Sequence, residues 1–173
     1  HGLQRTFSFL KVFDHISIVR QKLEYGSGKG SRKKNIVLLG CSRMGTIFIQ
    51  AFKKLHENVV VVDHDPTIIK NLIKSRVNCT YGDATSREVL DTMGLKNAKI
   101  LISTIPRVDE NIFILEYAKS INPKIHVIVT ADHVSEAFKL YDFGADYVIV
   151  PHVLSGEKIS MFLKDMVRSE KHL

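Results

Sequence analysis

Several hallmarks of secreted, membrane-spanning and metal-binding proteins are missing from this sequence. It has only two cysteines, Cys41 and Cys79, which make no disulfide framework, so a reducing cytosol is the expected environment. No apolar run approaches the roughly 18 residues that cross a bilayer, and no signal-peptide pattern is present; any membrane segment is expected upstream of His1. The histidines and cysteines show no His-x-x-x-His or Cys-x-x-Cys spacing, so we expect no metal site.

The composition is that of one ordinary globular domain, with 173 residues, 45% hydrophobic and 25% charged. The net charge of +7 is unevenly placed: residues 1–34 hold eight Lys/Arg and two acids, and the remaining 17 Lys/Arg face 16 acids. Apolar residues from Phe9 to Leu23 follow helical spacing, and the Gly- and Lys-rich stretch from Tyr25 to Lys34 follows. We therefore predict an amphipathic helix and basic flexible linker over residues 1–34, and a separate domain over residues 35–173.

The most informative stretch begins at Asn35 and reads NIVLLGCSRMGTIFIQAFKKLHENVVVVD. A short apolar run stops at Gly40, apolar residues at helical spacing follow Gly45, and a second apolar run ends in Asp63. Strand, glycine turn, helix, strand and acid in this order are typical of a dinucleotide-binding βαβ unit. The start of such a helix points unpaired N–H groups at the turn, which suits phosphate.

The glycine loop itself is Gly40-Cys41-Ser42-Arg43-Met44-Gly45. Ser42 stands where a middle glycine is usual; it narrows the approach to the backbone but offers a hydroxyl, and Arg43 adds a fork of donors for phosphate oxygens. Asp63 is placed to accept hydrogen bonds from a ribose, with His64 shaping that corner. Two alternatives stay open: a turn that binds nothing, and a Cys41 thiol that senses oxidants instead of packing as a small apolar group.

Beyond Asp63 the chain continues to alternate between strand and helix patterns. Helices are predicted after Pro66, and at residues 86–93, 109–118, 133–143 and around 159–166, with strands at residues 77–81, 100–102, 125–129 and 147–150. This predicts an α/β fold, a doubly wound parallel six-stranded Rossmann-like sheet in the order 3-2-1-4-5-6. Gly40, Asp63, Asp83 and Thr104 all follow carboxyl ends of strands, where such sheets bind ligands.

Five stretches, in this order, resemble the KTN domain, also called RCK or TrkA-N, that regulates potassium channels and transporters: Gly40–Gly45, Val62–Pro66, Gly82–Thr85, Asp109–Asn111 and Gly144–Pro151. The short C-terminus is similar to the domains that end Kef-type cation/proton antiporters. The resemblance implies a regulatory domain without catalysis, on the cytoplasmic face of the cell membrane. It implies binding of AMP, ADP, ATP or NAD(H), assembly into a homodimer or higher ring, and gating of a membrane cation transporter or channel, expected upstream in the same polypeptide.

The resemblance also implies roles for single residues, position by position. Gly40, Ser42, Arg43 and Gly45 would hold phosphate, with Cys41 and Met44 in the same loop. Asp63 would take the adenosine ribose, Asp83 and Ala84 the adenine end, and Thr104 the inner wall. Asn111 would begin a helix that forms part of the dimer cleft. Thr130-Ala131 stands where many members place an arginine, so contacts there stay open.

Two other function classes are open to the sequence. A small NAD(P)-dependent oxidoreductase needs groups that handle substrate, yet the Tyr-x-x-x-Lys pair occurs only as Tyr25 to Lys29, ahead of the core. A redox-sensing nucleic-acid-binding protein needs a second helix beside the one predicted at residues 8–23. We therefore expect no enzyme and no nucleic-acid partner. The helix at residues 109–118 carries more apolar residues than one sheet-facing stripe requires, which favours a second face against another subunit.

Overall fold

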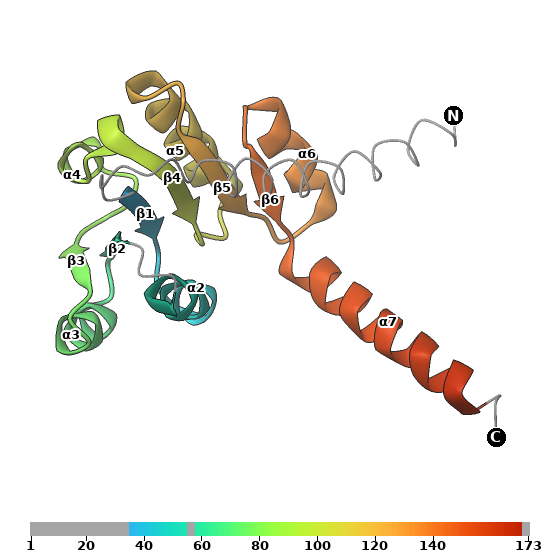
Figure 1. Ribbon diagram of the computed structural model, residues 1–173. Helices are drawn as coiled ribbons and strands as arrows, with labels where there is room; N and C mark the ends of the chain where they lie inside the picture. The colour runs from blue at the N-terminus through green and yellow to red at the C-terminus, as the bar shows by residue number, and fades with distance from the viewer. Residues whose placement is uncertain (1–34, 55–57, 171–173) are drawn as a thin grey trace, which may run out of the picture. The chain divides into compact units, whose positions relative to one another are not determined.

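The part of the chain that the structure describes alternates strands with helices. In the computed structural model residues 35–54 and 58–170 are described, so the helix and linker predicted over residues 1–34 lie outside the described residues. The elements, drawn in Figure 1, are β1 (Asn35–Leu39), α2 (Arg43–Lys54), β2 (Asn58–Asp63), α3 (Pro66–Lys74), β3 (Asn78–Tyr81), α4 (Arg87–Thr92), the 3-10 turn η1 (Leu95–Asn97), β4 (Ala98–Ser103), α5 (Val108–Ile121), β5 (His126–Thr130), α6 (Val134–Asp142), β6 (Tyr147–Ile149) and α7 (Pro151–Glu170).

The six strands form one parallel sheet in the order β3-β2-β1-β4-β5-β6. The predicted fold class and strand order are confirmed. The order reverses between β1 and β4, which pair directly, with Leu39 opposite Ser103. The chain leaves these two neighbouring strands in opposite directions along the sheet, and this opens the carboxyl edge at the position where ligands bind in such folds.

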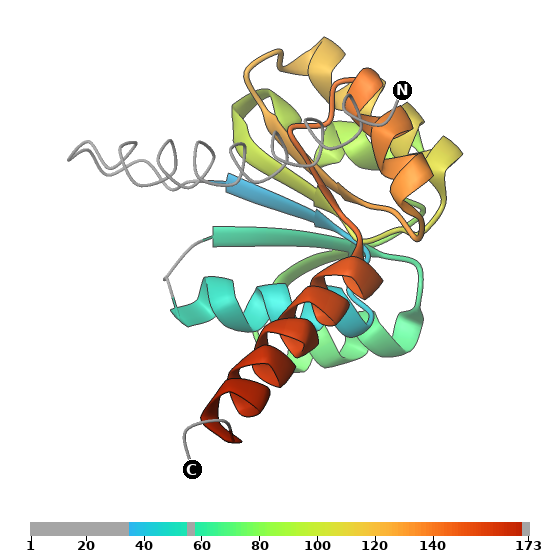
Figure 2. The same cartoon turned by 90° about the vertical axis from the view of Figure 1, so that its right-hand side faces the viewer.

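Both faces of the sheet are covered by helices, with α2 and α3 on one face and α4, α5 and α6 on the other (Figure 2). Val37 and Leu39 belong to the core beneath α5, whereas Ile36 and Leu38 belong to the core beneath α2 and α3. A strand buried on both faces requires apolar side chains in both directions, and this explains the uninterrupted run at residues 36–39.

Most apolar side chains of helix α5 are buried or partly buried within the same chain. Ile114, Leu115 and Ala118 face the core. Phe113 and Tyr117, two further apolar residues of this helix, are partly buried, and their rings stack with centroids 5.9 Å apart. The guanidinium of Arg87 from α4 lies 5.9 Å and 5.8 Å from these two rings, at the distance of a cation–π contact. Arg87 of the same chain therefore contacts part of the apolar surface of α5 that faces away from the sheet, and a subunit contact through this helix stays a prediction.

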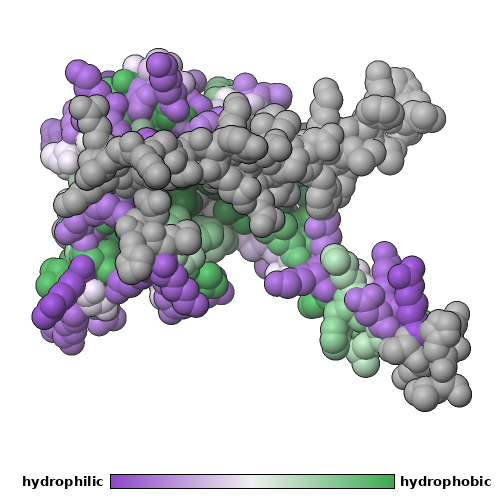
Figure 3. Space-filling view, viewed as in Figure 1, coloured by the Kyte–Doolittle hydropathy of each residue, from purple (hydrophilic) through white to green (hydrophobic). Residues whose placement is uncertain are grey.

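Helix α7 differs from the other helices because none of its described residues is buried. Ile159, Phe162 and Leu163 are 59%, 64% and 53% exposed, and apolar and polar residues lie side by side along it (Figure 3). It begins at Pro151, earlier than the helix predicted around residues 159–166, because proline suits the first turn of a helix. In the described part of the chain, no helix is both long and apolar enough to cross a membrane.

Candidate functional site

The centre of the candidate site is the contact between the ends of β1 and β4. The N–H of Thr104 donates to the carbonyl of Leu39 at 2.9 Å, and its Oγ1 donates to the carbonyl of Gly40 at 3.1 Å. The predicted inner wall, Thr104, thus lies directly against the predicted phosphate loop. These two segments are far apart in sequence, and the strand order alone brings them together.

Two glycines keep the loop close to its surroundings. Gly40 has φ of 80°, and a Cβ there would lie 2.7 Å from Oγ1 of Thr104. A Cβ on Gly45 would lie 2.6 Å from the carbonyl oxygen of Gly40. Gly40 therefore needs the left-handed backbone that glycine adopts readily, and Gly45 allows α2 to start directly against the turn.

The start of α2 offers donors to an anion. The side chains of Ser42 and Arg43 are exposed, and the backbone N–H groups of Ser42, Arg43 and Met44 donate to no other described residue. The first N–H groups of any helix lack intrahelical partners, and they carry the positive end of the helix dipole. Thr46 fixes the turn, since its Oγ1 donates to the carbonyl of Ser42 at 2.7 Å. This geometry fits a phosphate group.

Asp63 has structural partners that the sequence did not predict. Its side chain is only 6% exposed, and Oδ2 accepts a hydrogen bond from the N–H of Cys41 at 2.6 Å. Oδ1 accepts from the N–H of Asp65 at 2.8 Å. The carboxylate therefore ties the end of β2 to the glycine loop, and the N–H of Cys41 is not available to a ligand. Each carboxylate oxygen can accept a second hydrogen bond, so the ribose contact stays a prediction.

The next corner is formed by the ends of β2 and β3. The N–H of Gly82 donates to the carbonyl of Asp63 at 3.0 Å, which places Asp83 beside the β2 end. Oδ1 of Asp83 accepts from the N–H of Thr85 at 2.8 Å and from its hydroxyl at 2.7 Å. These bonds, helped by the nearby His64, hold the pKa of Asp83 below its usual range. The carboxylate is thus ionised and exposed, whereas Ala84 is buried in the core.

Asn111 lies behind the site wall and is fully buried. Its amide nitrogen donates to the carbonyls of Ile105 at 2.8 Å and Thr130 at 3.0 Å. The hydroxyl of Thr130 donates to the same carbonyl of Ile105 at 2.9 Å. Among the described residues the Oδ1 atom of Asn111 has no hydrogen-bond partner. Asn111 therefore fixes the loop after β4 to the end of β5; its part in ligand binding or in a dimer cleft stays a prediction.

The two thiols are packed groups. Cys41 is 4% exposed, and burial raises the pKa of its thiol despite the opposing hydrogen bond with Thr46. A reactive cysteine needs a lowered pKa, so the geometry favours the packed thiol over the oxidant sensor. No group of three His, Cys, Asp or Glu side chains within residues 35–54 and 58–170 is arranged to hold a metal ion.

The sequence does not predict Thr130 and Ile105 as the partners of Asn111, or the contact of Arg87 with two aromatic rings of α5. The shared acceptor is the backbone carbonyl of Ile105. Every residue type carries a backbone carbonyl, so the sequence does not indicate which one accepts these hydrogen bonds. The motif that contains Asp146 was noticed, but its role was not: Asp146 accepts from the Lys119 ammonium at 2.6 Å and from the Val127 N–H at 2.8 Å. These contacts lie at the amino end of β5, away from the candidate site, and they pin the start of β6 to its neighbour.

Comparison with known sequences gives one consistent result. The TrkA-N domain family matches residues 36–151. Potassium channel protein 1 of Methanocaldococcus jannaschii is 32% identical over 126 residues, which are 72% of this chain and 38% of that protein. The glutathione-regulated potassium-efflux system protein KefC of Escherichia coli is 27% identical over 137 residues, 75% of this chain and 22% of that protein. The chain thus spans well under half the length of these relatives.

Solved structures agree on the fold. The TrkA-N domain of the inner membrane protein ybaL from Escherichia coli has a TM-score of 0.72 at 25% identity, covering 78% of this chain and 99% of that one. The GsuK RCK domain has a TM-score of 0.71 at 22% identity, and the match covers 85% of this chain and 31% of that one. The Kef CTD of Shewanella denitrificans, in an AMP-bound form, has a TM-score of 0.68 at 20% identity, and the match covers 78% of this chain and 82% of that one.

Proposed function

The chain belongs to the TrkA-N domain family, and from this premise we propose that it is a nucleotide-binding regulatory domain of a membrane cation transport system. The observation that carries the proposal is the glycine turn held between Thr104 and α2, with the exposed Arg43 beside unbonded N–H groups. That arrangement suits a phosphate. Together with the family, it supports a regulatory role in which no reaction is catalysed.

The proposed ligand is an adenine nucleotide, one of AMP, ADP, ATP or NAD(H). Its phosphates would lie on the N–H groups of Ser42, Arg43 and Met44 and on the Arg43 guanidinium, and its ribose beside Asp63 and His64. The adenine would lie near Asp83 and Ala84, with Thr104 as the wall of the site. The AMP-bound Kef CTD and the GsuK structures bound to ADP and NAD support this class of ligand.

The proposed partner is a potassium or other cation transporter or channel, with this domain on the cytoplasmic face of the cell membrane. The support is the kind of relative: a potassium channel protein and a potassium-efflux protein, both much longer than the matched segment. A transporter elsewhere in the same polypeptide would explain why the domain matches only part of each relative.

Signal transmission would need a second copy of the domain. We expect α7 to supply the contact, because Ile159, Phe162 and Leu163 expose apolar surface that one domain leaves uncovered. A nucleotide shifts such a dimer only through a difference in affinity between two arrangements. Sedimentation equilibrium with and without AMP tests this; a monomer under both conditions would remove the gating model, and Phe162→Ser should weaken association.

Calorimetry with AMP, ATP and NADH tests the nucleotide site directly. Arg43→Ala should lower the affinity for phosphate-bearing ligands about tenfold or more, as expected for loss of a charge-assisted hydrogen bond of roughly 1.5–3 kcal/mol. Adenosine affinity should be nearly unchanged. Lys139→Ala, which removes one exposed cation from α6, is the matched control and should leave every affinity as in the wild type. Equal AMP affinities of Arg43→Ala and wild type would contradict the assignment.

A further inference from the structure

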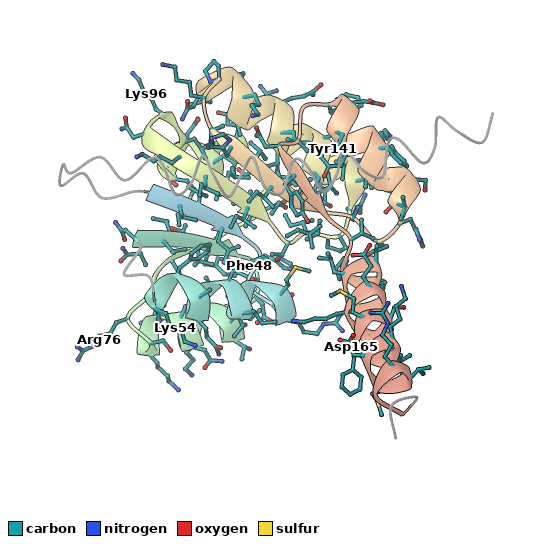
Figure 4. The ribbon with its side chains drawn as sticks, turned by 45° about the vertical axis from the view of Figure 1, so that its right-hand side comes forward. Phe48, Lys54, Arg76, Lys96, Tyr141 and Asp165 are labelled. Carbon is teal, nitrogen blue, oxygen red and sulfur yellow. The ribbon has the colours of Figure 1, made fainter. Side chains whose placement is uncertain are left out.

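Exposed cations gather at the edge of the sheet where the strands begin. Because every strand pair is parallel, the residues just ahead of each strand meet at this one edge. Exposed lysines or arginines stand ahead of β2, β3, β4 and β5, and we call them the amino-edge cations: Lys53, Lys54, Lys74, Arg76, Lys96 and Lys124. Figure 4 shows Lys54, Arg76 and Lys96 at this edge.

Acids are fewer at the same edge, and two of them have partners. Asp146, ahead of β6, accepts a hydrogen bond from Lys119 at 2.6 Å, and Asp91, near the end of α4, accepts one from the Tyr117 hydroxyl. Asp142 is exposed at the end of α6. Glu57, which precedes β2 in the sequence, lies outside the described residues. The amino-edge cations are therefore in excess, and the excess lies before β2 to β5.

Helix ends explain only part of this arrangement. Lys53 and Lys54 lie in the last turn of α2, and Lys74 in the last turn of α3, where a cation complements the negative end of the helix dipole. Arg76 follows α3, and Lys124 lies in the loop before β5. Lys96 lies in a 3-10 turn of only three residues. Arg76 and Lys124 lie two and three residues beyond the ends of α3 and α5, outside the last turn in which the helix dipole acts. The row therefore extends beyond what helix electrostatics requires.

We propose that this edge docks on an anionic lipid surface. Neighbouring strands lie about 4.8 Å apart, so the row from β3 to β5 extends about 19 Å, which is too wide for one small anion and suits many headgroups at once. Each cation held near an anionic leaflet strengthens binding about fivefold. The edge is opposite the carboxyl edge, so lipid and nucleotide would not compete. The inference rests on the membrane setting proposed above, not on nucleotide binding.

The test uses the full chain with vesicles of phosphatidylcholine alone and of equal parts phosphatidylcholine and phosphatidylglycerol. Residues 1–34 are themselves basic, so the comparison between variants, not binding by the wild type, decides the outcome. One variant removes three amino-edge cations, Lys54→Gln, Lys74→Gln and Lys96→Gln. The matched control removes three exposed lysines elsewhere, Lys139→Gln, Lys158→Gln and Lys164→Gln. Urea unfolding and AMP calorimetry are measured on all three proteins.

We expect the amino-edge variant to bind anionic vesicles about a hundredfold more weakly than the wild type. The control variant should lose far less affinity. Added salt should weaken binding by the wild type, and neutral vesicles should bind none of the proteins. Equal losses in both variants, or equal binding to neutral vesicles, would overturn the inference. So would displacement by inorganic phosphate at constant ionic strength, or tighter binding to a DNA duplex with the same variant dependence. If AMP binding is absent while the lipid results hold, only the nucleotide proposal fails.

Discussion

Replacing Gly45 by alanine tests whether the close approach of α2 to the glycine turn shapes the site. The new Cβ would lie 2.6 Å from the carbonyl oxygen and 3.3 Å from the carbonyl carbon of Gly40. These are backbone atoms, held by the Gly40 N–H bond to the Val62 carbonyl at 2.8 Å, so the helix must move away from the strand. Overpacking of this kind costs about 1–3 kcal/mol.

Alanine also gains helix propensity, and this opposes the clash. The gain inside a helix is about 1 kcal/mol relative to glycine, so Gly45→Ala should lower the free energy of unfolding by about 0–2 kcal/mol net. Gly156→Ala is the matched control, because it makes the same change within α7 where a Cβ meets nothing within 4 Å. That variant should gain up to about 1 kcal/mol.

Urea unfolding followed by circular dichroism measures both variants, and calorimetry with AMP measures the site. Gly45→Ala should lose nucleotide affinity as well as stability, because the displaced helix start carries the N–H groups of Arg43 and Met44. Gly156→Ala should keep the affinity of the wild type. If Gly45→Ala were as stable as Gly156→Ala, the argument that Gly45 is required by close contact would be wrong.

Three further predictions follow from single contacts. Asp63→Asn should lower the free energy of unfolding, because the wild-type carboxylate accepts hydrogen bonds from the Cys41 and Asp65 N–H groups. Calorimetry on the wild type should show tighter binding of NADH than of NADPH, since Asp63 repels a 2′-phosphate. Equal affinities for the two would contradict the ribose role of Asp63. Asn111→Leu should cost about 1–3 kcal/mol in urea unfolding, because the buried Thr130 carbonyl loses its donor; an unchanged midpoint would contradict this. Burial tends to raise the pKa of Asp146, but hydrogen bonds from Lys119 and Val127 outweigh it and leave that pKa lowered. The stability that the Asp146 carboxylate contributes is present above the unfolded pKa of about 3.9 and is lost as the pH falls through its folded pKa. Below about pH 4 the wild type should therefore lose more stability than Asp146→Asn. Parallel pH profiles of the two proteins would refute the stabilising role of this carboxylate.

The sequence by itself determined the order and type of the elements. Uninterrupted apolar runs such as residues 36–39 indicate strands buried on both faces, and helices between them force a parallel sheet. Glycines directly follow two of the predicted helices, those at residues 86–93 and 133–143: Gly94 and Gly144 have φ of 71° and 95°. These signals are local, because they depend on the conformations that each residue type can adopt and on which side chains avoid water. The boundary between residues 34 and 35 as a domain limit stays a prediction.

Only the tertiary structure decided which partner each polar group found. Asp63 was placed at a strand end from the sequence, but its bond to the Cys41 N–H spans 22 residues, and the Thr104 bond to Gly40 spans 64. Residue type gives a side chain the capacity to donate or accept, whereas strand order and register select the atom that it meets. The same is true of the amino-edge cations, which are scattered from Lys53 to Lys124 in the sequence. They lie at one edge because every strand of the sheet starts there.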